Sequence, residues 1–517
     1  MAWLRIWEHA MKCEARLESG TVSVEVQRAE TPCLPVPRLD PECACSMHPA
    51  PSAGSGSQRW ASMPVKDRVR VLRAARRLMA ERAQEFPEAI WPGLARSKAD
   101  TLMVELVPLL AGCRFLERKA ERILSPRRLG WSGRPVWLAG VAAEVLRIPL
   151  GHVLVIGPSN FPLFIPGSQV LQALAAGNRV TWKPGQGGEA VALQVARALA
   201  DAGLPDGVLT VTDESVEAAQ RVLATCPDKV VFTGSSRTGH LLLKDLAESA
   251  TPAVLELSGA DAMVVTPSAD LQEVARMVAF GLRLNGAAVC LSPRRLLATP
   301  KTMAALRPLL QEELAKVPAV PLEARTAERL RVALEEAAGK GAEVKGAFQP
   351  EAQRPLVVDR ASAEMAVASS DLFAPVISLL EAESMLHVPQ LYATCAYGLG
   401  VSIFCDGKDE KMARMLGSML NAGTLLINDI IVPTADPRVP FGGRGESGYG
   451  VTRGAEGLLE MTAVKTVLVR RGGVKLHLDP PRGMDQDAYG GLIQVMYGKG
   501  LGVRWAGVKR LLKAMRS

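Results

Sequence analysis

The chain has 517 residues, a length that accommodates two to four domains, so a peptide hormone or a lone binding module is excluded. Hydrophobic residues make up 48% and charged residues 22% of the chain, as in ordinary globular proteins and unlike disordered or fibrous ones. The net charge of +8 is concentrated at the C-terminal end, because residues 497–517 hold six basic residues and no acidic one. The nearly neutral remainder and an aromatic content of 4% argue against a protein that binds nucleic acid.

The sequence predicts neither a signal peptide nor a membrane-spanning segment. Arg5 and Glu8 interrupt the apolar N-terminus, and no apolar run reaches the 18 residues that suggest a transmembrane helix. The nine cysteines are an odd number spread over the chain, which favours free thiols in a reducing compartment. We therefore expect a cytoplasmic protein.

The first 57 residues differ in composition from the rest. Six prolines lie between Thr31 and Pro51, and a Ser, Ala and Gly segment follows at 52–57. This composition is typical of a linker and predicts a disordered N-terminal extension. Cysteines 33, 43 and 45 and His48 lie in this segment, but their spacing matches none of the paired-cysteine zinc patterns, so we expect no metal site.

An alternation of strands and helices makes up the rest of the chain. An amphipathic helix begins at Met63, with apolar residues on one face and arginines on the other. After a β-rich stretch at 136–147, short apolar runs at 153–156, 180–182, 208–211 and 230–232 alternate with amphipathic helices. This order predicts βαβ units, and hence an α/β fold with a parallel sheet.

For three residues, the sequence allows both a chemical role and an ordinary structural role. Cys290 follows the loop 285–289 and is either a nucleophile or a buried structural thiol. Glu256 lies in the apolar run 253–257, where burial would raise its pKa towards that of a general base, unless it faces solvent from an edge strand. Asn160 follows the end of a strand, so its amide either donates to an oxyanion or serves a turn.

Two glycine-containing segments are candidates for a phosphate site. Residues 443–448 match the glycine spacing of dinucleotide-binding proteins, but they do not follow a strand, so they are not that fingerprint. At 232–236 a strand ends in Gly234 and a helix starts at about Ser235. That segment either presents backbone N–H groups to an anion or is an ordinary helix start.

Taken in order, these segments resemble the NAD(P)-dependent aldehyde dehydrogenase superfamily. The resemblance covers roughly residues 63–469, and the 34 residues between Glu256 and Cys290 are similar to the family's spacing of base and nucleophile. The motifs that carry it are Gly157-Pro158-Ser159-Asn160-Phe161-Pro162, Ala175-Ala176-Gly177-Asn178, Lys183-Pro184, Phe232-Thr233-Gly234-Ser235, Leu255-Glu256-Leu257, Cys290, Phe373 with Pro375, Pro440-Phe441-Gly442-Gly443 and Ser447-Gly448.

The resemblance implies a role for each matching residue. Cys290 would attack the aldehyde carbon, Asn160 and the Cys290 N–H would hold the oxyanion, and Glu256 would activate the water that hydrolyses the thioester after hydride transfer to NAD or NADP. Lys183 and Gln186 would hold the adenine ribose, Ser235 the pyrophosphate, and Asp371 and Phe373 the nicotinamide ribose. The full set of expected cofactor contacts is Ile156, Gly157, Lys183, Gln186, Gly234, Ser235, Asp371 and Phe373.

Several positions depart from the family pattern and indicate a divergent member. They are Ser159, Ala287-Ala288, Ser258-Gly259-Ala260 and Asp371. Gln186 lacks the negative charge that would repel a 2′-phosphate, and Arg237 adds a positive charge, so NADP stays open beside NAD.

The C-terminal segment 503–516 reads as a basic amphipathic helix, with Trp505 near its start. Three interpretations stay open. It contacts an anionic membrane surface, it docks on its own subunit or a partner, or it is a solvated helix packed on the body.

As the resemblance implies, we expect an α/β enzyme of the aldehyde dehydrogenase-like fold, with a Rossmann-like cofactor domain, that oxidises an aldehyde and forms a homodimer or tetramer. The C-terminal tail and the apolar run 161–165 favour an aliphatic, hydrophobic aldehyde. The alternatives are a CoA-dependent acylating relative and a scaffold that has lost its chemistry. The expected divisions are an N-terminal extension 1–57, a cofactor domain 58–255 with a β-arm at 136–147, a catalytic domain 256–435, a return to the cofactor domain and arm at 436–475, and a C-terminal extension 476–517.

Overall fold

The computed structural model describes residues 55–94, 96–135, 138, 140–471, 478, 480 and 483–516. The four candidate metal ligands of the N-terminal segment lie outside these residues, as do Val136 and Trp137 of the predicted arm. Helix α2 (Ser55–Ser62) begins inside the segment expected to be disordered. It is anchored because Trp60 is fully buried and its Nε1 donates to the Leu174 carbonyl at 3.0 Å.

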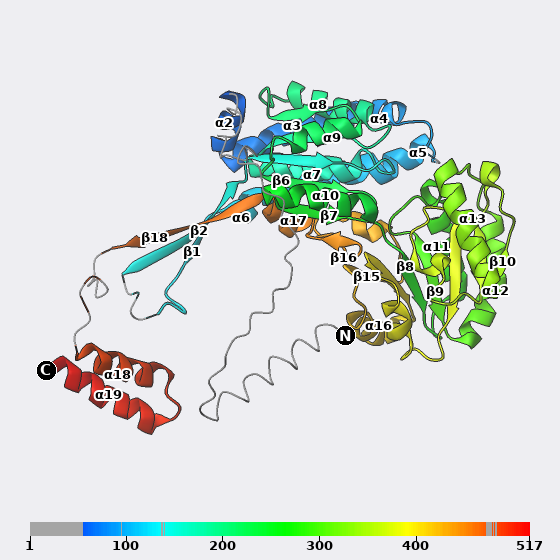
Figure 1. Ribbon diagram of the computed structural model, residues 1–517. Coiled ribbons are helices and arrows are strands. Elements are labelled where there is room, and N and C mark those ends of the chain that lie inside the picture. The colour runs from blue at the N-terminus through cyan, green and yellow to red at the C-terminus, as the bar shows by residue number, and fades with distance from the viewer. Residues whose placement is uncertain are drawn as a thin grey trace, which may run out of the picture. The chain divides into compact units, whose positions relative to one another are not determined.

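The first sheet has the strand order β17-β7-β6-β3-β4-β5 and is parallel except for β17 (Figure 1). Its strands are β3 (His152–Ile156), β4 (Arg179–Lys183), β5 (Leu209–Val211), β6 (Lys229–Thr233), β7 (Ala253–Glu256) and β17 (Gly448–Tyr449). The predicted strands and the parallel sheet are thus confirmed. Most strand ends differ from the predicted ones by one residue.

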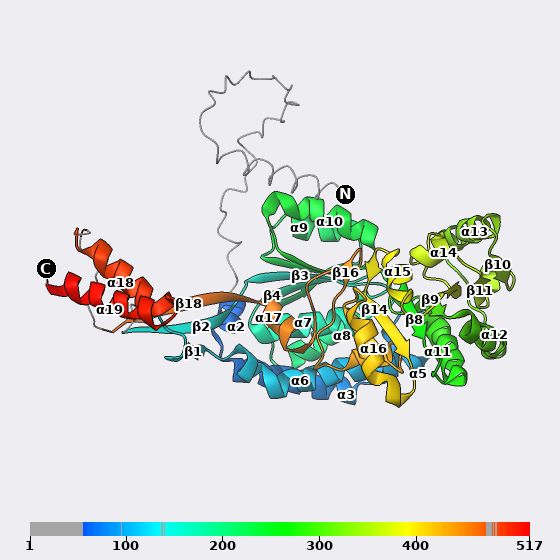
Figure 2. The ribbon, with the colours of Figure 1, turned by 90° about the horizontal axis from the view of Figure 1, so that it is seen from below.

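Helices cover both faces of this sheet, because successive side chains of a strand point to opposite sides. Val153 and Val155 pack with the helices on one face, whereas Leu154 and Ile156 pack with those on the other. Figure 2 shows α9 and α10 on one side of β3 and β4, and α3, α6, α7 and α8 on the other. These helices are α3 (Val65–Glu81), α6 (Val107–Leu124), α7 (Phe164–Ala176), α8 (Glu189–Asp201), α9 (Val216–Leu223) and α10 (Ser236–Ser249). Short helical segments precede α6, namely α4 (Glu85–Ala89), α5 (Lys98–Thr101) and η1 (Leu102–Leu106).

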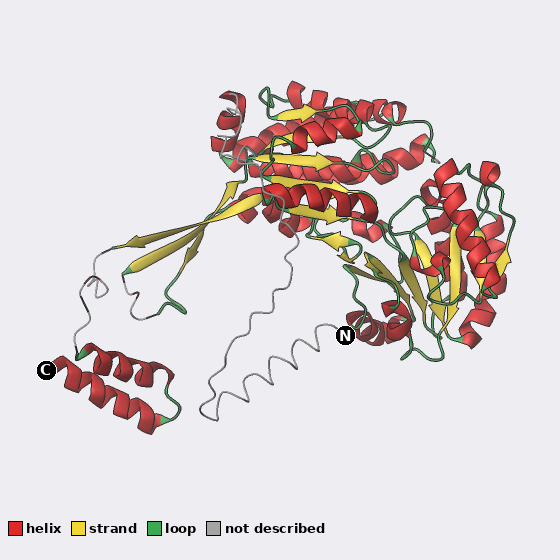
Figure 3. Ribbon diagram, in the orientation of Figure 1, coloured by secondary structure: helices red, strands yellow, loops and turns green. Residues whose placement is uncertain are grey.

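The second sheet has the order β10-β11-β12-β9-β8-β14-β15, in which only β10 is antiparallel to its neighbour (Figure 3). Its strands are β8 (Asp261–Val265), β9 (Pro293–Ala298), β10 (Glu343–Lys345), β11 (Leu356–Asp359), β12 (Val376–Glu381), β14 (Gly400–Phe404) and β15 (Thr424–Ile427). Met263 and Val265 face one hydrophobic cluster, and Ala262 and Val264 the opposite one.

The helical segments of this second part include those that pack on the two faces of its sheet and short ones in the connections. They are α11 (Leu271–Arg283), η3 (Leu284–Ala287), α12 (Pro300–Ala315), α13 (Ala324–Gly339), η4 (Pro350–Ala352), α14 (Ala366–Ser369), α15 (Val388–Ala393), η5 (Gly407–Asp409), α16 (Glu410–Ser418) and η6 (Val432–Ala435). A two-stranded sheet of β13 (Tyr397–Gly398) and β16 (Arg444–Gly445) follows, and α17 (Gly454–Glu460) returns to the first core.

Two further pieces complete the described chain. A three-stranded antiparallel arm consists of β1 (Arg127–Leu129), β2 (Val141–Pro149) and β18 (Thr462–Arg470). Strands β2 and β18 pair along their whole length, from Val141 with Arg470 to Pro149 with Thr462. The C-terminal helices α18 (Asp485–Tyr497) and α19 (Leu501–Arg516) pack against each other. No helix within the described residues is long and apolar enough to cross a membrane.

Candidate active site

Two cavities meet at Cys290 and Glu256. The larger cavity has a volume of about 630 Å³ and lies along the ends of β6 and β7 and the start of α10. The smaller one, of about 130 Å³, is lined mostly by apolar side chains. Cys290, Glu256, Ile165 and Phe441 line both cavities. A ligand in either cavity can therefore reach the same thiol and the same carboxylate.

A strained turn presents Cys290. After α11 the backbone takes positive φ at Asn285, Gly286 and Ala287, at 52°, 60° and 62°. A side chain pays a conformational cost in that region, which is typical of functional sites. The turn is held by Arg294, whose guanidinium donates to the Ala287 carbonyl at 2.6 Å and is 1% exposed. On the other side Gly259 allows close approach, because a Cβ there would lie 2.4 Å from the Cys290 carbonyl oxygen.

The surroundings of Cys290 oppose its ionisation. Burial raises the pKa of the thiol, and the nearby carboxylates of Asp261, Asp371 and Glu256 raise it further. The positive charge of Arg453 acts in the opposite direction and lowers this pKa. The thiol is therefore mainly protonated at neutral pH, and reaction requires a group that takes up its proton.

Glu256 ends β7 and is buried, with 5% of its surface exposed. Its carboxylate accepts hydrogen bonds from Thr452 Oγ1, from Thr233 Oγ1 at 3.2 Å and from Gln169 Nε2 at 3.4 Å. Burial raises the pKa of this carboxyl above its ordinary value, against the lowering effect of Arg453 and the hydroxyl donors. The alternative of an edge-strand acid facing solvent is thus wrong, because β6 and β17 flank β7.

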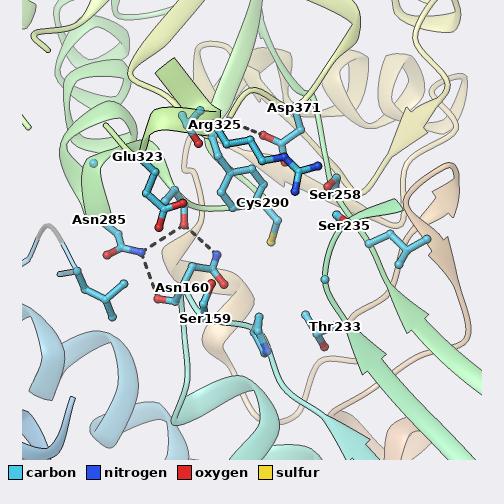
Figure 4. A pocket seen from close by; sticks show the side chains of 18 of the residues that line it. Ser159, Asn160, Thr233, Ser235, Ser258, Asn285, Cys290, Glu323, Arg325 and Asp371 are labelled. Carbon is cyan, nitrogen blue, oxygen red and sulfur yellow. Dashed lines mark hydrogen bonds between the residues drawn. The ribbon is translucent and has the colours of Figure 1, made fainter. Parts of the chain in front are cut away.

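Asn160 lies beside Cys290 in the larger cavity (Figure 4). Its Nδ2 donates to the Ala288 carbonyl at 2.8 Å, and Asn285 Nδ2 donates to the Asn160 carbonyl at 3.1 Å. Since an amide nitrogen carries two hydrogens, one donor of Asn160 remains for a reacting oxygen.

A buried ion pair supports the loop that carries Asn160. Arg96 and Glu105 form a salt bridge with side chains 1% and 0% exposed. Glu105 accepts from the backbone N–H groups of Leu163 and Phe164 at 3.0 and 2.6 Å, and Arg96 donates to the Asn160 carbonyl at 3.2 Å. The pair therefore fixes the turn between β3 and α7.

The larger cavity has features suited to a phosphate-containing ligand. Gly234 and Ser235 line it at the start of α10, where Ser235 is the N-cap residue and accepts from Thr238 N at 3.2 Å. A helix start offers free N–H groups and a partial positive charge. Ile156 and Gly157 lie at the carboxyl end of β3, the edge at which open α/β sheets bind ligands.

Lys183 and Gln186 follow the next strand. Lys183 ends β4 with 9% exposure and makes no salt bridge within the described residues, while Gln186 is exposed. Gly187 N donates to the carboxylate of Glu214 at 2.6 Å. An acid therefore lies one residue from the position expected to contact the adenine ribose.

Asp371 and Phe373 line the larger cavity, whereas Ile156, Gly157, Lys183 and Gln186 are not among its lining residues. Asp371 is turned into the protein. Its carboxylate accepts from Phe373 N at 3.2 Å and Gly259 N at 3.4 Å and lies 3.3 Å from Arg294. Burial raises the pKa of Asp371 to about 6. Phe373 has a φ of 50°, so this segment also contains a strained residue.

Arg453 brings a positive charge to the apolar cavity. Its guanidinium carbon lies 4.4 Å from the ring centre of Phe441 and 5.4 Å from that of Phe164, and Nη1 donates to the Thr434 carbonyl. No carboxylate within the described residues forms a salt bridge with it. The backbone of Arg453 has φ 60° and ψ 178°, a region almost confined to glycine.

The sequence interpretation brought forward Cys290, Glu256, Asn160 and the glycine turn, and these residues do line one connected site. It missed Arg453, Glu214, Arg294 and the Arg96–Glu105 pair. The pair had a weak signal, because Glu105 is a lone charge between the apolar residues Val104 and Leu106. The other three become visible only when distant segments are brought together.

The fold and the site define an α/β enzyme in which a thiol and a carboxylate stand where a nucleotide-sized cavity meets an apolar one. The sequence profile described as "Aldehyde dehydrogenase family" matches residues 18–467, and the chain belongs to that family. The predicted family and the aldehyde dehydrogenase fold are thereby confirmed.

The names of several relatives refer to the oxidation of aldehydes. A 4,4'-diapolycopene aldehyde oxidase of Methylomonas sp is 28% identical, over 80% of this chain and 79% of the relative. A benzaldehyde dehydrogenase [NAD(+)] of Pseudomonas putida is 28% identical, over 79% and 85%. The crystal structure of a NAD-dependent aldehyde dehydrogenase from Sinorhizobium meliloti superposes with a TM-score of 0.73 at 25% identity, covering 81% of this chain and 85% of the other.

Proposed function

We propose that this aldehyde dehydrogenase oxidises an aliphatic, hydrophobic aldehyde to the carboxylic acid, with Cys290 as nucleophile, Glu256 as base and NAD or NADP as cofactor. The observation that carries this proposal is that the thiol and the carboxylate line both cavities. The cofactor then takes the larger cavity and the aldehyde the smaller one.

The protein groups act in sequence. Cys290 gives up its proton to solvent water in the cavity, and its sulfur forms a bond to the aldehyde carbon, whose oxygen becomes negative. Asn160 and the Cys290 N–H donate to that oxygen, which stabilises the charge. When bound, the nicotinamide ring supplies the oxidant by accepting a hydride. In the second half Glu256 takes a proton from water, and the water oxygen bonds to the thioester carbon. The carbon–sulfur bond then breaks to release the acid, and Glu256 returns its proton to the sulfur, which restores the thiol and the carboxylate.

The residues present fit a dinucleotide. The start of α10 at Gly234 and Ser235 would hold the pyrophosphate, and Lys183 and Gln186 the adenine ribose. Asp371 and Phe373, which line the same cavity as Cys290, would hold the second ribose. Glu214 beside Gly187 favours NAD, because its charge would repel a 2′-phosphate.

The substrate class follows from the small cavity. Its lining includes Met103, Val104, Phe161, Ile165, Phe280, Leu284, Val289 and Ile431. Such a lining favours an alkyl chain, since burying apolar surface contributes about 25 cal/mol per Å².

The arm offers a surface for a homodimer. Val464 and Leu468 on β18 are 58% and 66% exposed, so pairing of two arms would bury them. A dimer, or a tetramer built from two dimers, therefore accompanies the proposed activity, in a cytoplasmic setting.

The test is reduction of NAD and of NADP with short, long and aromatic aldehydes, for the wild type and Cys290→Ala. We expect activity with NAD that grows with alkyl chain length and disappears in the variant. Absence of turnover with every aldehyde, while the protein is folded and binds NAD, would support a scaffold that has lost its chemistry. A large acceleration by CoA would favour the acylating alternative instead.

A further inference from the structure

The two C-terminal helices form a hairpin that holds itself together by close backbone contact. A Cβ on Gly491 would lie 2.8 Å from the Gly507 carbonyl oxygen, and one on Gly507 would lie 2.7 Å from that of Gly491. Asp487 and Arg510 add a salt bridge of 2.7 Å between the helices. Figure 1 shows the two helices side by side, and several large apolar side chains of the pair are left exposed.

Large apolar residues gather where the hairpin turns. Ile493 and Tyr497 end α18, and Leu501 and Trp505 begin α19. The four-residue spacing in each pair places both members on one face of their helix. These four side chains are 58%, 67%, 85% and 62% exposed. The turn end therefore presents two aromatic and two aliphatic side chains to the surroundings.

Basic residues accompany them. Residues 483–516 carry six basic and two acidic side chains, and both acids, Asp485 and Asp487, lie in the first turn of α18, away from the hairpin turn. Lys499 lies in the turn and Arg504 in the first turns of α19. The hairpin is thus positive as well as apolar, whereas the rest of the chain is nearly neutral.

We propose that this hairpin docks on an anionic membrane surface, with Ile493, Tyr497, Leu501 and Trp505 inserted among the lipids and the basic residues at the headgroups. Aromatic residues favour the membrane interface, and lysine and arginine are attracted to anionic lipids. A second copy of the hairpin is a poorer partner, because it carries the same positive charge. Docking would hold the enzyme where hydrophobic aldehydes partition, although the binding itself does not depend on the proposed catalysis.

The experiment uses the full chain and vesicle sedimentation. Vesicles of phosphatidylcholine alone are compared with vesicles that also contain phosphatidylglycerol, at low and high salt. The wild type should bind the anionic vesicles and release partly at high salt. The triple variant Tyr497→Ser, Leu501→Ser, Trp505→Ser should lose about tenfold in binding, and Lys499→Gln with Arg504→Gln should lose the preference for anionic lipid.

A matched control separates docking from general loss of exposed apolar surface. Met415→Ser, Leu241→Ser and Val216→Ser remove side chains that are 61%, 51% and 65% exposed elsewhere, and should leave vesicle binding unchanged. Aldehyde turnover and circular dichroism report whether each variant is folded. Absence of wild-type binding, or equal binding by the hairpin triple variant, would overturn the proposal. So would a concentration-dependent oligomer that only the hairpin triple variant abolishes, since that result assigns the surface to a second copy.

Discussion

At the scale of single residues, Arg453 brings a positive charge to the cavity that contains Cys290. It lies between the rings of Phe164 and Phe441, lines the cavity that also holds Cys290, and has no carboxylate partner within the described part of the chain. It lowers a thiol pKa that burial and three carboxylates raise. Its removal should therefore make the thiolate rarer at a given pH.

We expect Arg453→Met to slow alkylation of Cys290 by iodoacetamide at pH 8, with the rate falling about tenfold for each unit by which the thiol pKa rises. The measurement is the pH dependence of labelling at Cys290, followed by mass spectrometry. Arg453→Lys should restore much of the rate. Arg283→Met, which removes a guanidinium 5.8 Å from the Phe280 ring, serves as the control and should have little effect. An unchanged pH profile in Arg453→Met would rule out an electrostatic role.

Glu256 should separate the two halves of the reaction. With Glu256→Gln, the thioester should form and then persist, because no carboxylate takes the proton of the attacking water. Rapid mixing should show a burst of reduced cofactor, followed by a steady rate lower by about 100-fold or more. Burial raises the pKa of Glu256. As the pH is lowered, the wild-type hydrolysis rate should therefore begin to fall at a higher pH than it would with an ordinary glutamate. A variant without a burst but with normal steady turnover would contradict the assignment.

Glu214 should govern the choice between NAD and NADP. Glu214→Gln removes the charge beside Gly187 while keeping a side chain that can accept from its N–H. We expect kcat/KM for NADP to rise about tenfold relative to NAD, comparable to about 1.4 kcal/mol. Glu217→Gln, on the neighbouring helix α9, is the control and should leave the ratio unchanged. A similar rise in both variants would point to a general charge effect.

The residues of the site were partly open to prediction. Each of the three main residues has a local signal in the sequence. Cys290 follows a loop that contains a glycine, Glu256 lies in an apolar run, and Asn160 follows the end of a strand. Arg453 follows Thr452 in an unremarkable loop, and only packing against Phe164, far away in the chain, gives it a place. Such a contact between distant segments cannot be predicted from the local sequence.

At the scale of elements, the turn from β3 to α7 depends on the buried Arg96–Glu105 pair. We expect Glu105→Gln to lower the free energy of unfolding by about 3–5 kcal/mol, because it leaves Arg96 charged and buried without its partner. Urea unfolding followed by fluorescence measures this change. The exposed pair of Lys98 and Glu88, whose side chains are 68% and 64% exposed, gives a matched control. Glu88→Gln should cost no more than about 1 kcal/mol. Equal losses in the two variants would mean that the pair does not support the turn.

The strands were predicted better than the connections between them. The runs at 153–156 and 230–232 are continuous apolar segments because both faces of a parallel sheet are covered, and this signal is local. Helix α18 was not predicted, since its glycines and scattered polar residues give a weak apolar stripe. Those glycines serve the contact with α19, which depends on the partner helix rather than on the sequence of α18 alone.

At the scale of the whole molecule, the two mainly parallel sheets lie around one thiol, that of Cys290. The order of the family motifs along the chain made that arrangement predictable. The arm and the hairpin are different, because each exposes apolar side chains whose partners do not lie in the same sheet or helix pair. Their roles concern surfaces outside the site, and periodicity alone does not identify what covers them. The arm therefore calls for a test of assembly rather than of chemistry.

We expect Val464→Glu with Leu468→Glu to convert the proposed dimer to a monomer. Both side chains lie on one face of β18 and are more than half exposed, so two carboxylates on each copy would meet like charges across a symmetric contact. Analytical ultracentrifugation over a range of concentrations measures the mass, and circular dichroism checks that the fold is retained. Leu193→Glu, at a position 46% exposed on α8, is the control and should leave the mass unchanged. Because no residue of the arm strands lines either cavity at Cys290, the monomer should keep its reactivity toward iodoacetamide at that thiol. A mass unchanged by the double substitution would assign the dimer contact to another surface.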